Sequence, residues 1–414
     1  MNENGLIVGI NEKPKTIGSW IVLSLQHVFA MFGATVLVPL LTGLDVGVAL
    51  VASGIGTLIY IACTRAKVPV YLGSSFAYIT TISAAIASTG GAGSAYVGLM
   101  VVGLIYAIVA TVIRFVGSGW IKKLLPPIVI GPMIIIIGLS LAPVAINSAG
   151  LNGSATWKEP VVALVTLLTV VVLSIKAKGF LKIVPFLVAI FVGYTAAIIV
   201  GLVDVSTVFT GYAFFQIPNF SFIGTYTLNF SQVLVFAPLA FVTIAEHIGD
   251  HVVLGEITGK DFLENPGLQN TLMGDGIATF VSAALGGPAN TTYGENTGVI
   301  AITKVGSVYV VGLAAIFAIL LGFFGYIQAF INSIPWAVIG GMTIVLYGLI
   351  AANGVKVLVK NKTDLGDMRN LVVVSTMLVI GLGGAILNIT SSSALSGMSL
   401  AAIVGILLKQ GITL

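Results

Sequence analysis

Long apolar stretches follow one another along nearly the whole chain, and they constrain its fold more than any other feature. The 414 residues are 57% hydrophobic and 8% charged, with a mean hydropathy of +1.12, whereas soluble domains carry roughly 25% charged residues. A soluble core cannot hide that much apolar surface, so lipid must be the solvent. Helices and closed barrels are the structures that span lipid. The stretches are continuous rather than alternating, which predicts helices.

We predict an all-α integral membrane protein with fourteen transmembrane segments. The predicted helices are 17–42, 47–64, 74–88, 94–115, 126–144, 160–175, 180–202, 231–250, 271–286, 295–304, 307–331, 335–353, 369–388 and 395–410. The third and the tenth are too short to cross a membrane alone. Irregular or β-favouring residues precede each of them, at 68–72 and 288–293. We therefore expect short β-strands before these two half-helices.

The basic residues test this layout, because Lys and Arg gather in cytoplasmic loops. With the N-terminus in the cytoplasm, all of the 18 Lys and Arg residues except Lys158 fall on the cytoplasmic side. This predicts a multi-pass protein of the cytoplasmic (inner) membrane with both termini in the cytoplasm. The net charge is only +4 and the basic residues are scattered, which argues against nucleic acid as a partner.

The chain also repeats itself weakly. Four matches occur in the same order and at similar spacings: 25–27 with 245–247, 54–57 with 276–279, Gly73 with Gly294, and 126–133 with 335–342. They divide the chain into repeats at 1–202 and 203–414, each with seven predicted helices. An odd number of helices inserts the second repeat upside down. Inverted repeats are typical of secondary transporters, whose site lies near the membrane midplane and is built from broken helices.

Two carboxylates in apolar surroundings are the main candidates for function. Glu295 opens the tenth helix and Glu246 lies inside the eighth. An acid at membrane depth is costly, and it usually binds a substrate or carries a proton. The half-helix N-termini would meet at a common centre and offer free N–H groups and positive dipole ends. The alternatives are that Glu295 is only a helix cap and that Glu246 is a structurally paired buried acid.

The residues after Glu295 form a specific pattern. It comprises Glu295, Asn296, Gly298, Thr303 and Lys304. This pattern resembles the signature of the nucleobase–ascorbate transporter family, also called nucleobase:cation symporter-2, and the resemblance extends from about residue 10 to the C-terminus. Gln26 and His27 resemble the helix-one motif of that family. The segments 24–39, 71–77 and 290–296 are most similar to its bacterial uracil:proton symporter branch. Xanthine and urate members usually open the signature with Gln, so the Glu favours uracil.

The resemblance implies a division of labour between helices. Helices 1–4 and 8–11 would form a core domain that carries the substrate. Helices 5–7 and 12–14 would form a gate domain that also makes a homodimer contact. The implied uracil contacts are Phe76, Glu246, Gly294 and Glu295, and the implied proton-coupling residues are Glu246, Asp250 and Glu295. The expected supporting residues are Gln26, His27, Tyr293, Asn296, Thr343 and Tyr347.

The chemistry of uracil agrees with these residues. Uracil is a flat neutral ring with two N–H donors and two carbonyl acceptors. An ionised carboxylate only accepts hydrogen bonds, so Glu246 and Glu295 suit the N–H edge. Backbone N–H groups at Gly294 suit a carbonyl, and a glycine lets the backbone approach closely. Phe76 can stack on the ring, a contact worth roughly 1–3 kcal/mol in other base-binding proteins.

A carboxylate shielded from water also suits proton coupling, because desolvation favours its neutral form. We expect Glu246 to take a proton from outside and release it inside. The uracil branch carries a His four residues after this Glu, whereas this chain has Asp250, followed by His251. Residues i and i+4 share a helix face, so Asp250 could still relay the proton. We expect Thr343 and Tyr347 to bond to this relay, and a solvated Asp250 is the alternative.

Three further expectations concern polar residues. We expect the segment 251–270 to be a solvated loop, Asp275 to lie at the start of helix nine, and Gln26 to bridge two helices.

The sequence also bears on competing functions. A xanthine or urate permease and sodium-coupled uptake remain alternatives. An enzyme is poorly supported, because the sequence has no HExxH, CxxC or Gly-rich phosphate loop. We expect no cofactor and no metal. A channel would need a continuous polar pore, and two acids would repel the substrate of an anion carrier.

Overall fold

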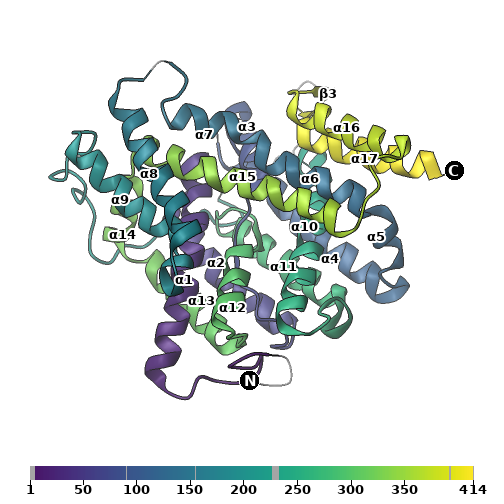
Figure 1. Ribbon diagram of the computed structural model, residues 1–414, viewed down its shortest axis with the longest axis horizontal. Helices are drawn as coiled ribbons and strands as arrows, with labels where there is room; N and C mark the ends of the chain where they lie inside the picture. The colour runs from purple at the N-terminus through teal and green to yellow at the C-terminus, as the bar shows by residue number, and fades with distance from the viewer. Residues whose placement is uncertain (1–4, 90, 154, 226–232, 391–392, 414) are drawn as a thin grey trace.

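The computed structural model describes residues 5–89, 91–153, 155–225, 233–390 and 393–413 (Figure 1). The helices of the first half are α1 (Ile17–Thr42), α2 (Val46–Cys63), α3 (Ile79–Thr89), α4 (Gly93–Val116), α5 (Gly119–Leu124), α6 (Pro127–Ser140), α7 (Ala142–Ser148), α8 (Lys158–Lys176) and α9 (Pro185–Ile199). Those of the second half are α10 (Val233–Thr258), α11 (Leu268–Ala284), α12 (Gly294–Thr303), α13 (Val308–Gly322), α14 (Gly325–Asn332), α15 (Trp336–Lys360), α16 (Met368–Leu382) and α17 (Gly397–Thr413).

The remaining elements are short. The strands are β1 (Leu72–Ser74), β2 (Asn290–Thr292), β3 (Ile386–Thr390) and β4 (Ser393–Ser396), and the other helical turns are η1 (Phe76–Tyr78), η2 (Gly179–Lys182) and η4 (Leu263–Gly267). β1 pairs with β2 and β3 pairs with β4, both antiparallel. The strands predicted before the two half-helices are therefore present, at 72–74 and 290–292.

Each predicted helical range contains a helix, but several boundaries were wrong. The third range begins with β1 and η1, so its α-helix starts only at Ile79. α10 continues to Thr258, which makes the first part of the predicted loop 251–270 helical. The predicted helix 369–388 ends at Leu382, and the hairpin of β3 and β4 follows it. Residues 231–232, where the eighth range was predicted to begin, lie outside the described residues.

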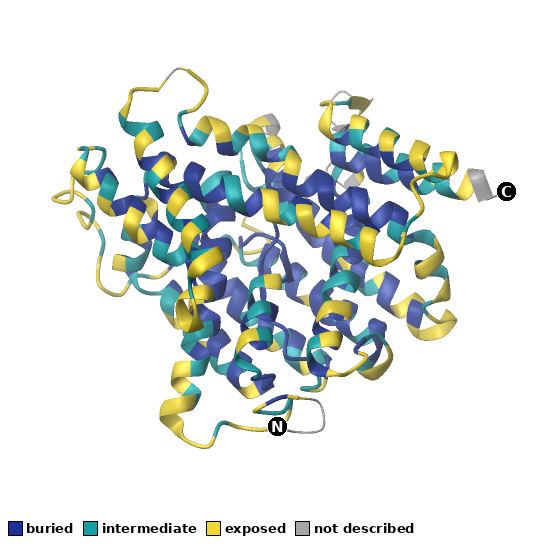
Figure 2. Cartoon of the chain, viewed as in Figure 1, coloured by how far each residue is buried: buried dark blue, intermediate teal, exposed yellow. Residues whose placement is uncertain are grey.

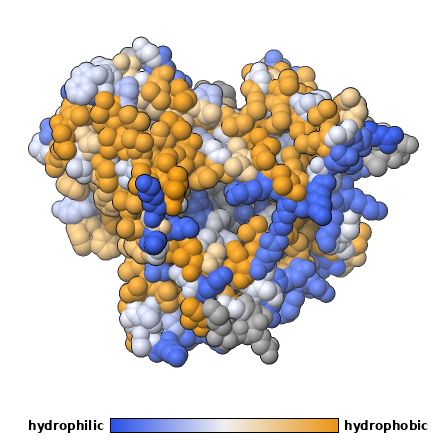
Figure 3. All heavy atoms as spheres, viewed as in Figure 1, coloured by the Kyte–Doolittle hydropathy of each residue, from blue (hydrophilic) through white to orange (hydrophobic). Residues whose placement is uncertain are grey.

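The exposed apolar surface indicates a membrane protein. On α8, Leu164, Leu168, Val172 and Ile175 follow one face of the helix, and each is at least half exposed (53%, 52%, 50% and 74%). Figure 2 shows exposed residues around the periphery and buried residues at the centre, and Figure 3 shows hydrophobic residues over much of the outer surface. An outward stripe of this kind is unfavourable in water and expected in a bilayer.

Among the described residues, six helical stretches are long and apolar enough to cross a membrane by length and composition alone. They are Ile17–Thr42, Val46–Cys63, Gly93–Val116, Pro127–Ser148, Lys158–Lys176 and Trp336–Lys360. Several other apolar helices are shorter, such as α9, α13 and α16. The total of fourteen spans, the inverted repeat and the two-domain division therefore stay predictions.

Glycines let the central helices approach each other closely. A Cβ on Gly103 of α4 would lie 2.6 Å from the carbonyl oxygen of Gly276 on α11, and a Cβ on Gly276 would lie 2.8 Å from that of Gly103. Gly47 of α2 and Gly322 of α13 oppose each other in the same way, at 2.8 and 2.7 Å. Small residues at helix crossings are typical of membrane proteins, because lipid gives apolar helices no hydrophobic reason to associate. Many of the 50 glycines thus serve packing.

Candidate functional site

The ribbon of β1 and β2 lies at the centre of the site. Leu72 pairs with Thr292, Gly73 with Thr291, and Ser74 with Asn290. All six strand residues are buried. Each strand leads directly into a helical turn that begins a half-helix, η1 at one end and α12 at the other. The paired strands therefore bring two helix N-termini, from segments far apart in sequence, to one place in the protein.

Tyr293 holds this ribbon together. Its ring lies over Gly73, where an added Cβ would come within 2.3 Å of the ring. Its hydroxyl donates to the carbonyl of Ser74 at 3.0 Å and accepts from Thr35 of α1 at 3.3 Å. Tyr293 is 3% exposed. Tyr293 thus supports the two strands and is too deeply buried to contact a ligand.

The acids of α10 face the second strand and α12. α10 packs against both β2 and α12. Asp250 accepts a hydrogen bond from the hydroxyl of Thr292 at 2.5 Å. Glu246, one turn earlier, is half-buried, and no described residue donates a hydrogen bond to its carboxylate. The packing of α10 on α12 places the helix of Glu246 and Asp250 beside the helix of Glu295. Asp250 is half-buried and bonded to Thr292, so the alternative of a solvated Asp250 was wrong.

Glu295 lies in the first turn of α12, beside open space. Gly294, the first residue of the helix, is exposed, and no atom would lie within 4 Å of a Cβ placed there. The carboxylate of Glu295 is half-buried and lines a cavity of about 190 Å³. The space and the free N–H groups of the helix N-terminus can accommodate a small ligand with both donors and acceptors.

Phe76 reaches across to the other half of the molecule. It begins η1, and its ring meets the ring of Tyr347 on α15 edge to face, with the centroids 6.3 Å apart. The expected hydrogen bonds from α15 to the acids are absent. The Tyr347 hydroxyl is buried without a partner, and the Thr343 hydroxyl donates to the carbonyl of Ile339 at 2.8 Å. That part of the predicted relay was wrong, because the Thr343 hydroxyl donates its hydrogen bond to a backbone carbonyl within α15 instead.

His27 and Asn296 connect α1 to α12. The side-chain amide of Asn296 lies 3.1 Å from Nδ1 of His27 and donates to the His27 carbonyl at 3.0 Å. Both residues are 1% exposed. They hold the residue next to Glu295 in place. The expected bridge from Gln26 is not made through its side-chain oxygen, which is buried without a partner.

The sequence reading missed a buried polar cluster on another face of α10. His247 Nδ1 lies 2.8 Å from Oδ2 of Asp275, and both side chains are fully buried. Asp275 therefore lies inside α11 and not at an exposed helix start. His251 Nδ1 donates to the His247 carbonyl at 2.7 Å, and the Tyr60 hydroxyl lies 2.5 Å from His251 Nε2. The apolar run 252–254, which continues α10 past His251, was the available signal.

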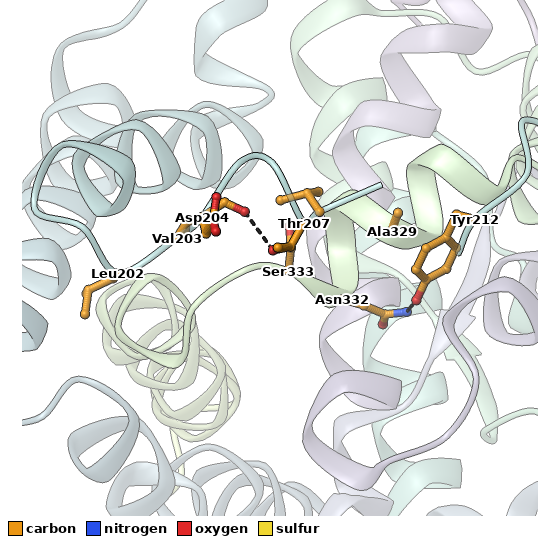
Figure 4. Close-up of a pocket in the computed structure, with 9 residues that line it drawn as sticks. Leu202, Val203, Asp204, Thr207, Tyr212, Ala329, Asn332 and Ser333 are labelled. Atoms are coloured by element: carbon orange, nitrogen blue, oxygen red, sulfur yellow. Dashed lines mark hydrogen bonds between the residues drawn. The ribbon is translucent and has the colours of Figure 1, made fainter. Parts of the chain in front are cut away.

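A second cavity lies away from these acids. It measures about 300 Å³ and is lined by residues of the loop after α9 and of α14. Figure 4 shows Asn332 and Tyr212 at one end of it, where the Asn332 amide donates to the Tyr212 hydroxyl at 3.1 Å. Asp204 lines it as well, but its carboxylate accepts from Ser206. None of the predicted site residues lines this cavity.

Comparison with known proteins decides the family. A model described as "Permease family" matches residues 18–390. The chain belongs to this permease family, nucleobase:cation symporter-2. It is 49% identical to the uracil permease of Bacillus caldolyticus over 98% of this chain and 94% of that protein. It is 45% identical to the uracil permease of Bacillus subtilis (strain 168), over 99% and 96%.

Membership of the permease family confirms that the chain is a membrane transporter and not an enzyme. Among solved structures, the transmembrane domain of a cyanobacterial bicarbonate transporter, BicA, matches with a TM-score of 0.60 and 16% identity, over 95% of this chain and 97% of that one. At that identity the likeness concerns the fold alone. The two chains thus share their overall fold.

Proposed function

We propose that this permease imports uracil across the cytoplasmic membrane together with protons. The observation that supports the proposal is that α10, which carries Glu246, packs against α12, whose first turn carries Glu295 beside the open space at Gly294. Two carboxylates and adjacent free N–H groups match a ligand that has both N–H donors and carbonyl acceptors. The relatives named uracil permease support uracil as that ligand.

The substrate contacts follow from this geometry. Glu295 and Glu246 accept from the N–H edge of the ring, and the backbone at Gly294 donates to a carbonyl. Phe76 lies against the ring face, with Tyr347 behind it. A site built on hydrogen bonds strongly rejects analogues that lack the right edge. We therefore expect uracil to be preferred over cytosine, whose ring edge has a different donor pattern, and over thymine, which is bulkier.

Proton coupling is assigned to the same group of acids. Charged carboxylates repel each other, and a water-poor site favours their neutral forms. A proton taken up by Glu246 would reduce this repulsion and favour binding of the neutral base. Asp250, one turn away and bonded to Thr292, offers the next place for the proton. Release of both the proton and uracil on the cytoplasmic side would complete the cycle.

The architecture that we propose is fourteen spans in a seven-plus-seven inverted repeat. A core domain of predicted helices 1–4 and 8–11 would move against a gate domain of helices 5–7 and 12–14, with a homodimer formed through the gate. The packing of α4 on α11, α2 on α13 and α6 on α15 supports a pairing between the two halves. Both termini would lie in the cytoplasm.

The test is uptake of radiolabelled uracil into proteoliposomes that contain the purified protein. Uptake should be driven by an inward proton gradient in the absence of sodium. Unlabelled uracil should compete strongly, and thymine, cytosine, xanthine and urate should compete weakly. Strong competition by xanthine or urate would instead assign a purine permease. Uptake that needs a sodium gradient would contradict proton symport.

A further inference from the structure

The cavity beside Glu295 continues along one face of α12. Its lining includes Glu295, Gly298 and Ile302, which are spaced three and four residues apart and therefore share a helix face. This face extends from the first turn of the helix to its last. No atom would lie within 4 Å of a Cβ on Gly298. The cavity thus runs from Glu295, at the edge of the proposed site, to Ile302 in the last turn of α12.

The opposite wall comes from another part of the chain. The segment 182–187, which runs from the last residue of η2 into the first turn of α9, lines the cavity together with Phe29 and Ala30 of α1. Lys182 is the one basic residue among the lining residues, and it belongs to the predicted cytoplasmic side. The ring of Phe29 meets that of Phe180 in η2 edge to face, with the centroids 6.1 Å apart. This aromatic contact holds η2, which leads into the segment 182–187, against α1.

The far end of the cavity lies on the side of the N-terminus. α12 ends at Thr303, and the backbone N–H of Ile7 donates to the carbonyl of Lys304 at 2.7 Å. Val8 and Val305 form a parallel bridge next to it. The N-terminal segment was predicted to be cytoplasmic from the distribution of basic residues. With this predicted orientation, the end of α12 lies on the cytoplasmic side.

We propose that the Glu295–Gly298–Ile302 face of α12 is the route by which the substrate leaves for the cytoplasm, with the segment 182–187 as its outer wall. The proposal rests on the proposed function for the identity of the substrate, but the route itself follows from the cavity. Gly298 keeps the route open because it has no side chain. Separation of Phe180 from Phe29 would widen it.

Cysteine labelling tests the route. Cys63 is the single cysteine of the chain, so Cys63→Ser provides the background once its uracil uptake has been verified. In that background, Gly298→Cys and Ile302→Cys should react with a charged, membrane-impermeant maleimide in inside-out vesicles and not in right-side-out vesicles. Ile300→Cys is the matched control, since Ile300 is fully buried on the same helix, and it should stay unlabelled in both.

The outcomes separate the route from the substrate. Uracil should slow the labelling of Gly298→Cys. Cytoplasmic labelling that uracil does not slow would support the route and reject uracil as the ligand. Labelling of Gly298→Cys from the outside only, or its absence from both vesicles while Ile302→Cys reacts, would overturn the route.

A second variant tests the width of the route without labelling. Gly298→Val adds a side chain where the structure has free space, so the fold should persist. We expect the maximal rate of uracil uptake to fall while equilibrium binding of uracil to the detergent-purified protein is retained. Gly298→Ala should reduce the rate less than Gly298→Val. Uptake by Gly298→Val at the parent rate would contradict the proposal.

Discussion

Glu246 and His247 are neighbours in sequence, yet their side chains have opposite surroundings. Consecutive residues of a helix point in directions about 100° apart, so one faces the half-buried site and the other the interior between α10 and α11. Glu246 has no hydrogen-bond donor among the described residues, whereas His247 is bonded to Asp275. The carboxylate of Glu246, which has no donor, is free to bind a ligand, whereas the hydrogen bond between His247 and Asp275 links α10 to α11.

The first prediction concerns Glu246→Gln. The amide has nearly the same shape but cannot take up and release a proton. Proteoliposomes with this variant should lose proton-driven accumulation of uracil. Glu256→Gln is a suitable control, because Glu256 is exposed and pairs only with Lys360 at the surface. Uphill accumulation by Glu246→Gln would show that another group carries the proton.

The second prediction concerns Asp275→Ala. This change leaves the buried His247 without its hydrogen-bond partner, and a buried polar group left unsatisfied costs about 1–3 kcal/mol. The midpoint of thermal unfolding in detergent should fall clearly. The double variant His247→Leu with Asp275→Leu should recover part of that loss, because it removes both buried polar groups. An unchanged midpoint for Asp275→Ala would mean that the pair does not stabilise the fold.

At the scale of elements, close helix crossings determine where the site residues lie. α11 carries Asp275, which anchors α10, and α11 itself is set by its crossing with α4 at Gly276 and Gly103. The β1–β2 ribbon depends in turn on Asn290, whose amide donates to the carbonyls of Ala52 at 3.3 Å and Ala278 at 3.2 Å. The position of Glu246 and Glu295 is therefore a consequence of close contacts among α2, α4 and α11, which do not carry these two acids.

The third prediction tests one such crossing. In Gly276→Ala the new methyl group would lie 2.6 Å from Cβ of Tyr106 and 2.8 Å from the Gly103 carbonyl oxygen. Overpacking of this kind costs roughly 1–3 kcal/mol, so thermal stability in detergent should fall. Gly348→Ala on α15 is the control, since its Cβ would meet no atom within 4 Å. A larger loss for Gly348→Ala than for Gly276→Ala would contradict this account of the crossing.

At the scale of the whole molecule, the exposed apolar faces are stable only in a bilayer. The half-buried acids make part of the interior polar, as the binding of a polar ligand requires. The fold places the two helix N-termini at one centre although more than half of the chain separates them. A transporter needs such a centre to be reached from either side in turn. The cavity along α12 is the access that we propose from the cytoplasmic side.

The fourth prediction belongs to this scale. Coupling to protons is a property of the whole cycle, so a protonophore should abolish accumulation of uracil in proteoliposomes. Exchange of external labelled uracil for internal unlabelled uracil should continue, because exchange needs no net driving force. Liposomes without protein give the background. Accumulation that survives the protonophore but stops when sodium is removed would assign sodium as the coupling ion.

The apolar pattern by itself determined the solvent, the helical class and most helix positions, because lipid allows few solutions for backbone hydrogen bonds. The signature around Glu295 pointed to the family that the comparison confirmed. The apolar pattern and the signature are both local in sequence, and so are the irregular stretches that form β1 and β2. The two site acids were predicted from their cost in an apolar segment, and the helices that carry them, α10 and α12, pack against each other.

Only the tertiary structure decided which polar residues face each other. The partners of Asp275 and His251 are His247 and Tyr60, and Tyr60 lies far from His251 in sequence. The end of α10 was also decided by the tertiary structure, since the helix continues past Asp250, where it was predicted to end, as far as Thr258. A buried polar group must find a partner in three dimensions, and the choice of that partner depends on helix crossings that no local pattern encodes.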